Sequence, residues 1–361
     1  MTDRDWNAAR ALVMRHGWNA VAYQILNPGM RHWFSRAGDA VAGYAAFAGT
    51  WVVAGAPVCA PERLASAATE LEADAVGRGA RVLFFGAGAR LEQVYARRAG
   101  HSLVRLGAQP VWDPAAWPDI VRRKSSLRAQ LNRARNKGVH IEEWPAARAQ
   151  SSDALRAVLR EWLATRGLPP LSFLVVPDIL DTLDDRRTFV AERDGRVVGF
   201  LVGTPVPARR GWLVEEWPRT RDAPNGTTHS LVDVAMRAFA ADRSSYVTLG
   251  LAPLAQHGAN GLDAPPPWLR VVLRWARAHG RRFYNFAGLE AFKASMQPMT
   301  WEPIYAIAPG GTFTPRMLRA VAGAFSAGNP ERLVARALLS AAREELHRWR
   351  VRHERPSRAS H

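Results

Sequence analysis

The order of helices and strands that the sequence predicts occurs twice along the chain, and this repetition limits the possible folds more than any other feature. The spacing of apolar residues and the positions of Gly and Pro predict the elements of each half. For the first half these are helices at 5–16 and 61–78 and strands at 31–36, 40–47, 50–55 and 81–86. For the second they are helices at 151–166, 229–242 and 267–279 and strands at 187–193, 196–204, 211–216, 246–250 and 281–286. Each half thus begins with a helix, continues with a strand hairpin, and later has a further helix followed by a strand.

A short stretch of sequence repeats in step with this order. The residues FSRAGDAVAGY at 34–44 align with VAERDGRVVGF at 190–200, and in both an exposed turn separates two strands before a Gly–aromatic pair. Together the two observations indicate a duplicated α+β unit, in which helices flank a hairpin-rich sheet. This pattern resembles the N-acetyltransferase-like (GNAT-like) fold. We therefore predict tandem GNAT-like domains at 1–121 and 151–313, a basic linking helix and connector at 122–150, and a basic amphipathic helical tail at 314–361.

Length and composition fit a folded protein of two domains. The chain has 361 residues, of which 48% are hydrophobic and 14 are Trp, and these can supply two cores. Cys59 is the single cysteine, which excludes an intramolecular disulfide and a cysteine-cluster metal site and suits a reducing compartment. The N-terminus mixes charged and apolar residues and shows no secretory signal. We expect a cytoplasmic protein that is peripheral on the inner face of the cytoplasmic membrane.

One uncharged run, 40–60, has about the length that a membrane span requires. Gly43, Gly49, Gly55 and Pro57 divide it into two segments of strand length. This division predicts a buried hairpin rather than a transmembrane helix, and we expect Cys59 to be a small buried residue.

The positive charge of the chain is high, and part of it is concentrated between the two predicted domains. The formal net charge of +17 favours polyanionic partners such as RNA or an anionic membrane surface. Leu127, Leu131 and Ala134 fall on one face of a predicted helix at 122–138 that has no acidic residue. We predict that this helix contacts phosphates of tRNA or of lipid headgroups; the alternative is a solvated helix between domains. Its cations are Arg122, Arg123, Lys124, Arg128, Arg133, Arg135 and Lys137.

The segment from Thr314 onward is also basic, with ten arginines against four glutamates. Apolar residues alternate with the arginines in two predicted helices, 315–325 and 330–352. This pattern fits docking onto the second domain, and equally a helix that lies on an anionic bilayer.

A single lysine marks the stretch where we expect the chemistry. Only three of the 49 basic residues are lysines, and Lys293 lies in a segment, 283–305, whose pattern predicts a strand, a Gly turn at 285–289, a short helix and a strand. A compact ammonium and a planar guanidinium are not interchangeable in a site. The alternative is a chance surface lysine.

Most catalytic signatures are missing from the chain. It has no serine-hydrolase, zinc-protease or Walker motif, and its ten histidines lack metal-ligand spacing. The loop at 222–229 lacks the Gly-rich pattern that would hold the diphosphate of coenzyme A at a helix N-terminus. We therefore expect neither a metal nor a cofactor.

Several short motifs are informative through their order and spacing. They are RHGWN at 15–19, GAP at 55–57, the basic helix at 122–138, EEWPRTRDAPNG at 215–226, LGLAPL at 249–254, YNFAGL at 284–289, Phe292-Lys293 and W-x-P-x-Y at 301–305. This set resembles the catalytic, C-terminal domain of the bacterial phosphatidylglycerol lysyltransferase family, also called aminoacyl-phosphatidylglycerol synthases or multiple peptide resistance factors.

The resemblance implies a reaction that moves an aminoacyl group from aminoacyl-tRNA to the glycerol hydroxyl of phosphatidylglycerol. It aligns the family's Asp-x-x-Arg motif with Glu216 and Arg219, and its helix lysine with Lys293. Glu216 is then the ligand of the α-amino group or the general base, while Arg219 and Lys293 hold phosphates or the developing negative charge. No covalent nucleophile is needed, because aminoacyl-tRNA is already an activated ester. The residues expected to bind substrate are Asn225, Asn285 and Tyr305.

The sequence departs from the family pattern in four ways. Glu216 replaces an Asp, Trp-Pro at 217–218 replaces an apolar pair, and Ser295-Met296 stand where Lys and Phe are usual. We also expect the membrane-embedded flippase domain of the family to be absent. Two alternatives therefore stay open: the same transfer to another lipid or a small-molecule acceptor, and a non-catalytic RNA- or membrane-binding protein with this fold. For Glu216 and Arg219 the structural alternative is an ion pair at a strand end.

Overall fold

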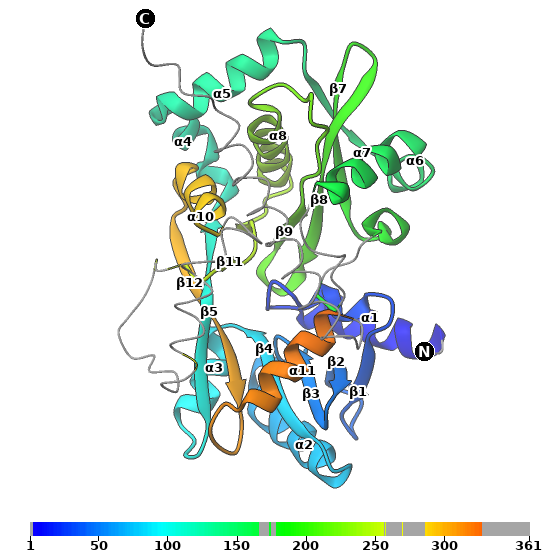
Figure 1. The fold of residues 1–361 in the computed structure, drawn as a ribbon, viewed down its shortest axis with the longest axis vertical. Coiled ribbons are helices and arrows are strands. Elements are labelled where there is room, and N and C mark those ends of the chain that lie inside the picture. The colour runs from blue at the N-terminus through cyan, green and yellow to red at the C-terminus, as the bar shows by residue number, and fades with distance from the viewer. Residues whose placement is uncertain are drawn as a thin grey trace, which may run out of the picture.

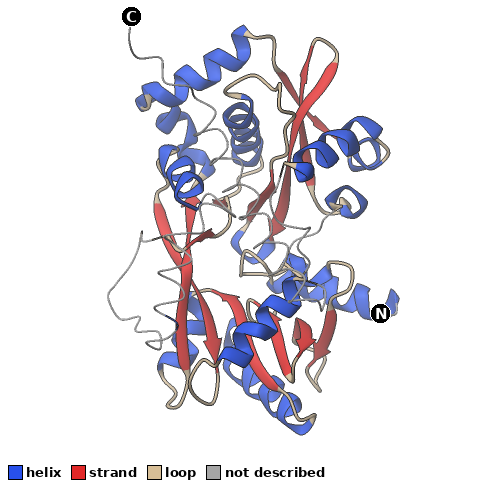
Figure 2. Cartoon of the chain, in the orientation of Figure 1, coloured by secondary structure: helices blue, strands red, loops and turns tan. Residues whose placement is uncertain are grey.

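The computed structural model describes residues 3–165, 173–174, 178–255, 257, 269 and 286–326 (Figures 1 and 2). The first half forms α1 (Asp3–His16), η1 (Tyr23–Leu26), β1 (Arg31–Phe34), β2 (Val41–Phe47), β3 (Thr50–Ala54), η2 (Pro61–Arg63), α2 (Leu64–Gly77), β4 (Arg81–Ala87), α3 (Ala89–Ala96) and β5 (Ser102–Trp112). Next come η3 (Pro114–Ala116), α4 (Trp117–Arg123), α5 (Ser125–Asn136), β6 (His140–Trp144), α6 (Ala146–Gln150), α7 (Asp153–Ala164) and η4 (Ile179–Thr182). The remainder forms β7 (Arg187–Arg193), β8 (Arg196–Val206), η5 (Pro207–Arg209), β9 (Gly211–Glu216), α8 (Thr227–Ala241), β10 (Tyr246–Thr248), β11 (Ala252–Pro253), α10 (Phe286–Ser295), β12 (Thr300–Ala308) and α11 (Pro315–Phe325).

One sheet runs through both halves of the molecule. Its strands lie in the order β1-β2-β3-β4-β12-β5-β10-β9-β8-β7-β6, and β11 pairs with β5 beside this path. In Figure 1 the first half lies below and the second half above, and β5 and β12 extend between them. The predicted helix at 267–279 and strand at 281–286 lie outside the described residues, apart from Leu269 and Phe286.

The two halves repeat the same pairing pattern. In the first, β1, β2 and β3 pair antiparallel, and α2 connects β3 to β4, which is parallel to it. In the second, β7, β8 and β9 pair antiparallel, and α8 connects β9 to the parallel β10. The hairpins β1–β2 and β7–β8 are the two copies of the short sequence repeat. The predicted α+β architecture is therefore confirmed.

Strand β12 brings the later part of the chain into the sheet of the first half. It pairs with β5 from Thr300↔Val111 to Ala308↔Ser102, and with β4 from Tyr305↔Ala87 onward. The sequence had placed this segment in the C-terminal domain. Because β4 and β5 lie on either side of it, β12 is a central strand that joins the two halves.

Helices cover both faces of the sheet in each half, as the alternation of side chains along a strand requires. In β3, Trp51 and Val53 pack in the core that includes α2, whereas Val52 and Ala54 pack in the core that includes α1 and α11. In β7, Phe189 packs in the core that includes α8, whereas the next residue packs in the core that includes α7.

The uncharged run at 40–60 forms the β2–β3 hairpin, as predicted. Val52, Val53 and Ala54 are almost completely buried, and Cys59 is buried beside them. Within the described part of the chain, no helix combines the length and the apolar character needed to cross a bilayer.

The predicted basic helix at 122–138 is two helices rather than one. Lys124 has an extended backbone (φ −93°, ψ 95°), which ends α4 before α5 begins. Leu127, Leu131 and Ala134 are buried, as their spacing predicted, and α5 packs against α8.

Helix α11 packs on the first half of the molecule (Figure 1). Ala320 and Ala324 are buried where the helix crosses β2 and β3, and Met317 is buried in a core that includes Leu83 of β4 and Val104 of β5. Gly323 permits this contact, because a Cβ added there would lie 2.4 Å from the ring of Phe47. Of the two alternatives left open for this helix, docking onto the protein and lying on a bilayer, the structure shows docking, chiefly onto β2 and β3 of the first half. The second predicted tail helix, 330–352, lies outside the described residues.

Replacement of Gly323 by Val tests the packing of α11. The larger side chain overlaps the Phe47 ring, so we expect the unfolding free energy to fall by about 1 to 3 kcal/mol. Leu318→Ala, on the exposed side of the same helix, is the control and should have a clearly smaller effect. Urea denaturation of both variants measures the difference, and equal losses would contradict this packing.

Candidate functional site

Lys293 is the centre of the candidate site and lies near the end of α10. The helix begins at Phe286, so Gly288 and Leu289 are helical, and the predicted Gly turn at 285–289 is wrong for the residues that the structure describes. The side chain of Lys293 is 1% exposed, which excludes the alternative of a surface lysine.

Two backbone carbonyl groups hold the side-chain nitrogen of Lys293. Nζ donates to the Gly250 oxygen at 2.8 Å and to the Leu251 oxygen at 3.0 Å. Both belong to the turn between β10 and β11, where Gly250 has a φ of +70°, a left-handed conformation that glycine adopts at low cost. The Gly250 N–H donates to the Thr248 hydroxyl at 3.1 Å, which supports the turn. The LGLAPL motif thus supplies the acceptors for the helix lysine.

Burial changes the protonation of this amine. Removal from water disfavours the ammonium form and lowers the pKa of Lys293 from 10.5 to about 7. The Trp217 ring centroid lies 6.0 Å from Nζ, and the same ring lies 6.2 Å from that of Phe292. Both protonation states of Lys293 are therefore accessible near neutral pH, as a group that transfers protons requires.

Glu216 ends β9 and leads into Trp217. Its side chain is buried, and its backbone pairs with Val202 of β8. Arg219 is exposed, and its backbone forms a bridge with Gly199. The chain therefore brings Trp217 next to Lys293 and leaves the Arg219 side chain at the surface.

The neighbouring residue Glu215, rather than Glu216, forms a buried ion pair, and its partner is Arg186. Glu215 accepts from Arg186 at 3.4 Å and from the Thr204 hydroxyl at 2.6 Å, and all three side chains are largely buried. Consecutive residues of a strand point to opposite faces, so Glu215 and Glu216 have different surroundings. The sequence motif alone did not distinguish these roles.

Of the three predicted substrate-binding residues, the two that the structure describes lie apart. Asn285 is outside the described residues. Asn225 is exposed and precedes Gly226, whose φ is +99° and whose added Cβ would lie 2.1 Å from the Gln130 oxygen of α5. Tyr305 is half-buried against the core of the first half. The structure thus places Asn225 beside the basic helix and Tyr305 in the other half of the molecule.

Two histidines lie close to α10 that the sequence did not single out. His229, in the first turn of α8, has its ring 5.1 Å from that of Phe292, and burial lowers its pKa. His257 Nδ1 lies 2.6 Å from Glu290 Oε1, and its ring stacks on Trp301 at 4.6 Å. Glu290 and Lys293 are three residues apart on one helix, a spacing visible in the sequence. The histidines are isolated in the sequence and gave no such signal.

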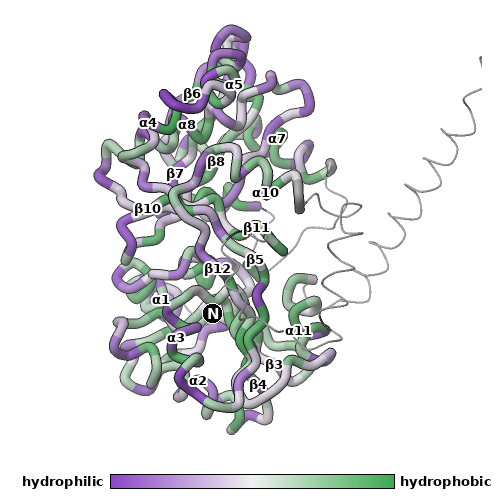
Figure 3. Tube along the Cα trace, turned by 90° about the vertical axis from the view of Figure 1, so that its left-hand side faces the viewer, coloured by the Kyte–Doolittle hydropathy of each residue, from purple (hydrophilic) through white to green (hydrophobic). Residues whose placement is uncertain are grey.

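The seven predicted phosphate contacts form what we call the basic surface. Arg122, Arg123, Arg128, Arg133, Arg135 and Lys137 are exposed and Lys124 is half-buried. One of them is neutralised locally, because Arg122 pairs with Asp119 at 2.6 Å on the preceding turn. Figure 3 shows that the end of the molecule with α5 and β6 is largely hydrophilic. In the described parts of the chain, no group of His, Cys, Asp and Glu side chains is arranged to hold a metal ion.

Fold and site together define the class of protein. The duplicated sheet with its crossover helices is GNAT-like. The model of a family described as "Phosphatidylglycerol lysyltransferase, C-terminal" matches residues 10–308. The chain belongs to this family, and the resemblance carried by the sequence motifs is confirmed.

Solved structures support this assignment. A domain from Agrobacterium fabrum, described as the C-terminal domain of a lysylphosphatidylglycerol synthetase, is 26% identical with a TM-score of 0.76, over 90% of this chain and 97% of that one. L-PGS from Bacillus licheniformis shares the fold at 20% identity and a TM-score of 0.72, over 93% and 96% of the two chains. A Bacteroides thetaiotaomicron protein of unknown function shares it at 14% identity and a TM-score of 0.61, over 86% and 98%. No curated protein sequence matches the chain.

Lys293→Met should alter how stability depends on pH. Between the lowered pKa of about 7 and the ordinary 10.5, the unfolded chain binds a proton that the folded chain does not. Stability of the wild type should therefore rise with pH across this window, relative to the variant. The gain is at most about 5 kcal/mol, because a pKa difference of one corresponds to about 1.4 kcal/mol. Urea denaturation from about pH 6 to 10 measures it, and parallel curves for the two proteins would contradict the lowered pKa.

Proposed function

We propose that this protein transfers an aminoacyl group from aminoacyl-tRNA to a hydroxyl group of a membrane lipid, phosphatidylglycerol. The observation that carries the proposal is the buried Lys293, with a pKa of about 7, in a chain of the phosphatidylglycerol lysyltransferase family. A reaction between an ester and a hydroxyl needs one group that can accept and return a proton at neutral pH.

In the proposed reaction, the acceptor hydroxyl attacks the carbonyl carbon of the aminoacyl ester. The hydroxyl proton moves to neutral Lys293 Nζ as the new carbon–oxygen bond forms. Collapse of the tetrahedral oxyanion breaks the bond to the tRNA ribose oxygen, and that oxygen takes the proton from Lys293. Substrate and product are both esters, so the exchange needs no further reactant, and bringing the two substrates together supplies much of the rate.

The contacts of Lys293 suit this role. A neutral amine has two N–H donors and one lone pair, and the oxygens of Gly250 and Leu251 accept from both donors. The lone pair is then left for the acceptor hydroxyl. An arginine in this place would stay protonated and could not accept the proton.

Glu216 and Arg219 take different roles in the proposal. The buried carboxylate of Glu216, next to Trp217, is suited to bind the α-ammonium group of the aminoacyl moiety. The exposed guanidinium of Arg219 is suited to the phosphate of a lipid headgroup at the surface. The basic surface on α4 and α5 would bind the tRNA backbone, since it offers six exposed cations close to one another.

A transfer assay tests the reaction. Purified protein, labelled aminoacyl-tRNA and phosphatidylglycerol vesicles should give labelled lipid, at a rate that rises as pH increases through about 7 because the neutral amine is the active form. Lys293→Ala and Lys293→Arg should each lower the rate by roughly a hundredfold or more, whereas Ser295→Ala, an exposed position on the same helix, should not. If no amino acid is transferred to any lipid, the proposal fails. Transfer to a different lipid would correct the acceptor alone.

The salt dependence of tRNA binding tests the basic surface. Replacing Arg128, Arg133 and Arg135 by Gln should weaken binding and reduce the slope of log K against log salt concentration by roughly two to three, because each phosphate contact contributes about 0.7 to 0.9. The matched control replaces three exposed arginines at the other end of the molecule, Arg36, Arg78 and Arg81, and so removes the same net charge. Equal effects of the two triple variants would contradict tRNA binding at α5.

A further inference from the structure

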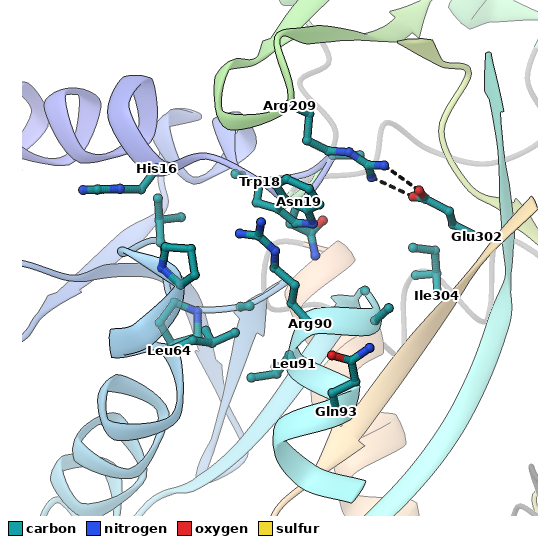
Figure 4. A pocket seen from close by; sticks show the side chains of 18 of the residues that line it. His16, Trp18, Asn19, Leu64, Arg90, Leu91, Gln93, Arg209, Glu302 and Ile304 are labelled. Carbon is teal, nitrogen blue, oxygen red and sulfur yellow. Dashed lines mark hydrogen bonds and ion pairs between the residues drawn. The ribbon is translucent and has the colours of Figure 1, made fainter. Parts of the chain in front are cut away.

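A cavity of about 280 Å³ lies at the edge of the first half, where it meets the second half (Figure 4). The start of α3 forms one wall, and Trp18 and Asn19 form another. Arg209, from η5, and Glu302, from β12, close a third side. This volume is at the lower end of the range for small-molecule sites.

The cavity and Lys293 lie on opposite faces of the sheet. Gln109 of β5 lines the cavity, whereas Trp112 of the same strand donates to the Met296 carbonyl group just after α10, at 2.9 Å. Residues three apart on a strand point to opposite faces. The cavity is therefore separate from the site of the proposed aminoacyl transfer, and what it binds does not depend on that reaction.

The carboxylate of Glu302, which lines the cavity, forms an ion pair with Arg209. Arg209 donates to both carboxylate oxygens of Glu302, at 2.8 and 2.6 Å, and Gln109 donates to the same carboxylate at 3.0 Å. The Arg209 guanidinium also lies over the Tyr246 ring, 3.5 Å from its centroid. Among the described residues that line the cavity, Glu302 is the one acid, and its charge is neutralised by Arg209.

Arg90 is the second guanidinium in the cavity, and it has a different setting. Its Cζ lies over the Trp18 ring, 3.3 Å from the ring centroid, a contact that leaves the N–H groups of the guanidinium available as donors. Partial burial and the positive charge of Arg209 lower its pKa, and within the described chain no carboxylate pairs with it. Among the described residues that line the cavity, the Arg90 charge therefore has no acid to balance it.

We propose that this cavity binds a small phosphate ester that carries an apolar group. The phosphate would lie at the edge of Arg90, because a planar guanidinium matches two phosphate oxygens, and the backbone N–H groups that begin α3 add positive polarity there. The apolar group would pack against Val58, Leu64 and Ile304, which line the same cavity. A soluble phosphate ester and a lipid headgroup present this same chemistry.

Titration calorimetry with four probes identifies the ligand chemistry. Hexyl phosphate should bind, and inorganic phosphate should bind more weakly because it leaves the apolar wall empty. Hexanoate, with the same chain and a carboxylate, should bind more weakly than hexyl phosphate, and equal binding would overturn the assignment to phosphate. Dihexanoylphosphatidylglycerol, used below its micellar concentration, separates the two sources: tighter binding than hexyl phosphate identifies a lipid headgroup, and weaker binding a soluble ester.

The single cysteine provides a second measurement inside the cavity. Cys59 lines it, and burial raises the pKa of its thiol to about 11, so alkylation by N-ethylmaleimide should be slow. Bound hexyl phosphate should slow alkylation further, in proportion to the occupancy found by calorimetry. Alkylation that is unaffected at saturating ligand would mean that binding occurs elsewhere, and would overturn the proposal.

Two arginines of the same helix region give a matched pair of variants. Arg90→Gln should weaken binding of hexyl phosphate at least about tenfold, because a charge-assisted hydrogen bond is lost. Arg97→Gln, at the exposed other end of α3, should leave it unchanged. Arg90→Lys keeps the charge without the planar fork and should give an intermediate affinity. Wild-type affinity in Arg90→Gln, or absence of binding by every phosphate probe to the wild type, would refute the site.

Discussion

The pairing of β12 with β4 and β5 is the contact on which both sites depend. Only residues 296–299 separate α10 from β12, so a strand fixed in the middle of the sheet holds Lys293 against the turn that follows β10. Consecutive residues of β12, Trp301 and Glu302, project to opposite faces of the sheet. Trp301 stacks on His257, which contacts Glu290 of α10, whereas Glu302 binds Arg209 across the cavity. A single strand therefore sets the geometry on both sides of the sheet.

The choice of lysine at position 293 follows from what burial does to a cation. A guanidinium keeps its proton even when buried, so an arginine there would be a permanent and costly internal charge. A lysine can relieve the same cost by losing its proton, and its pKa falls to about 7. The two carbonyl groups that accept from Nζ fix the nitrogen in either state. In a chain with 46 arginines and three lysines, one of the three lysines takes this buried position, where its side chain can lose the proton.

Local patterns predicted much of the fold, and long-range pairing accounts for most of what they missed. The hairpins and the buried face of α5 depend on residues close in sequence, so alternation and helical spacing were sufficient. Strand β5 has Gly107 and Pro110 in its middle, so its sequence did not predict a strand. It is stabilised by pairing with β10, β11 and β12, which lie far along the chain. The position of Tyr305 depends on that same pairing, so the motif that contains it could not reveal which half it would join.

The sequence predicted only part of the candidate site, again because long-range contacts are not visible in local patterns. Lys293 and Glu216 stood out through unusual composition and motif order, which are properties of the sequence itself. The exposure of Arg219, the approach of Trp217 and the pair formed by His257 and Glu290 are set by how strands and helices meet in space. The duplication, by contrast, was visible in the sequence, and it relates the two sites to each other.

Both sites lie where the chain leaves the second strand of a parallel pair, a position at which α/β sheets commonly bind ligands. Gly86, the residue before the last of β4, has a φ of +85°, and Gly250, shortly after β10, has a φ of +70°. In the first half, the Asn19 amide donates to the Gly86 oxygen at 3.0 Å; in the second, Lys293 donates to the Gly250 oxygen at 2.8 Å. Neither the carboxamide of Asn19 nor the guanidinium of Arg90 changes its protonation state near neutral pH, so neither can act as a general base. The two proposals thus assign different tasks to the duplicated position: anion binding in the first half and proton transfer in the second.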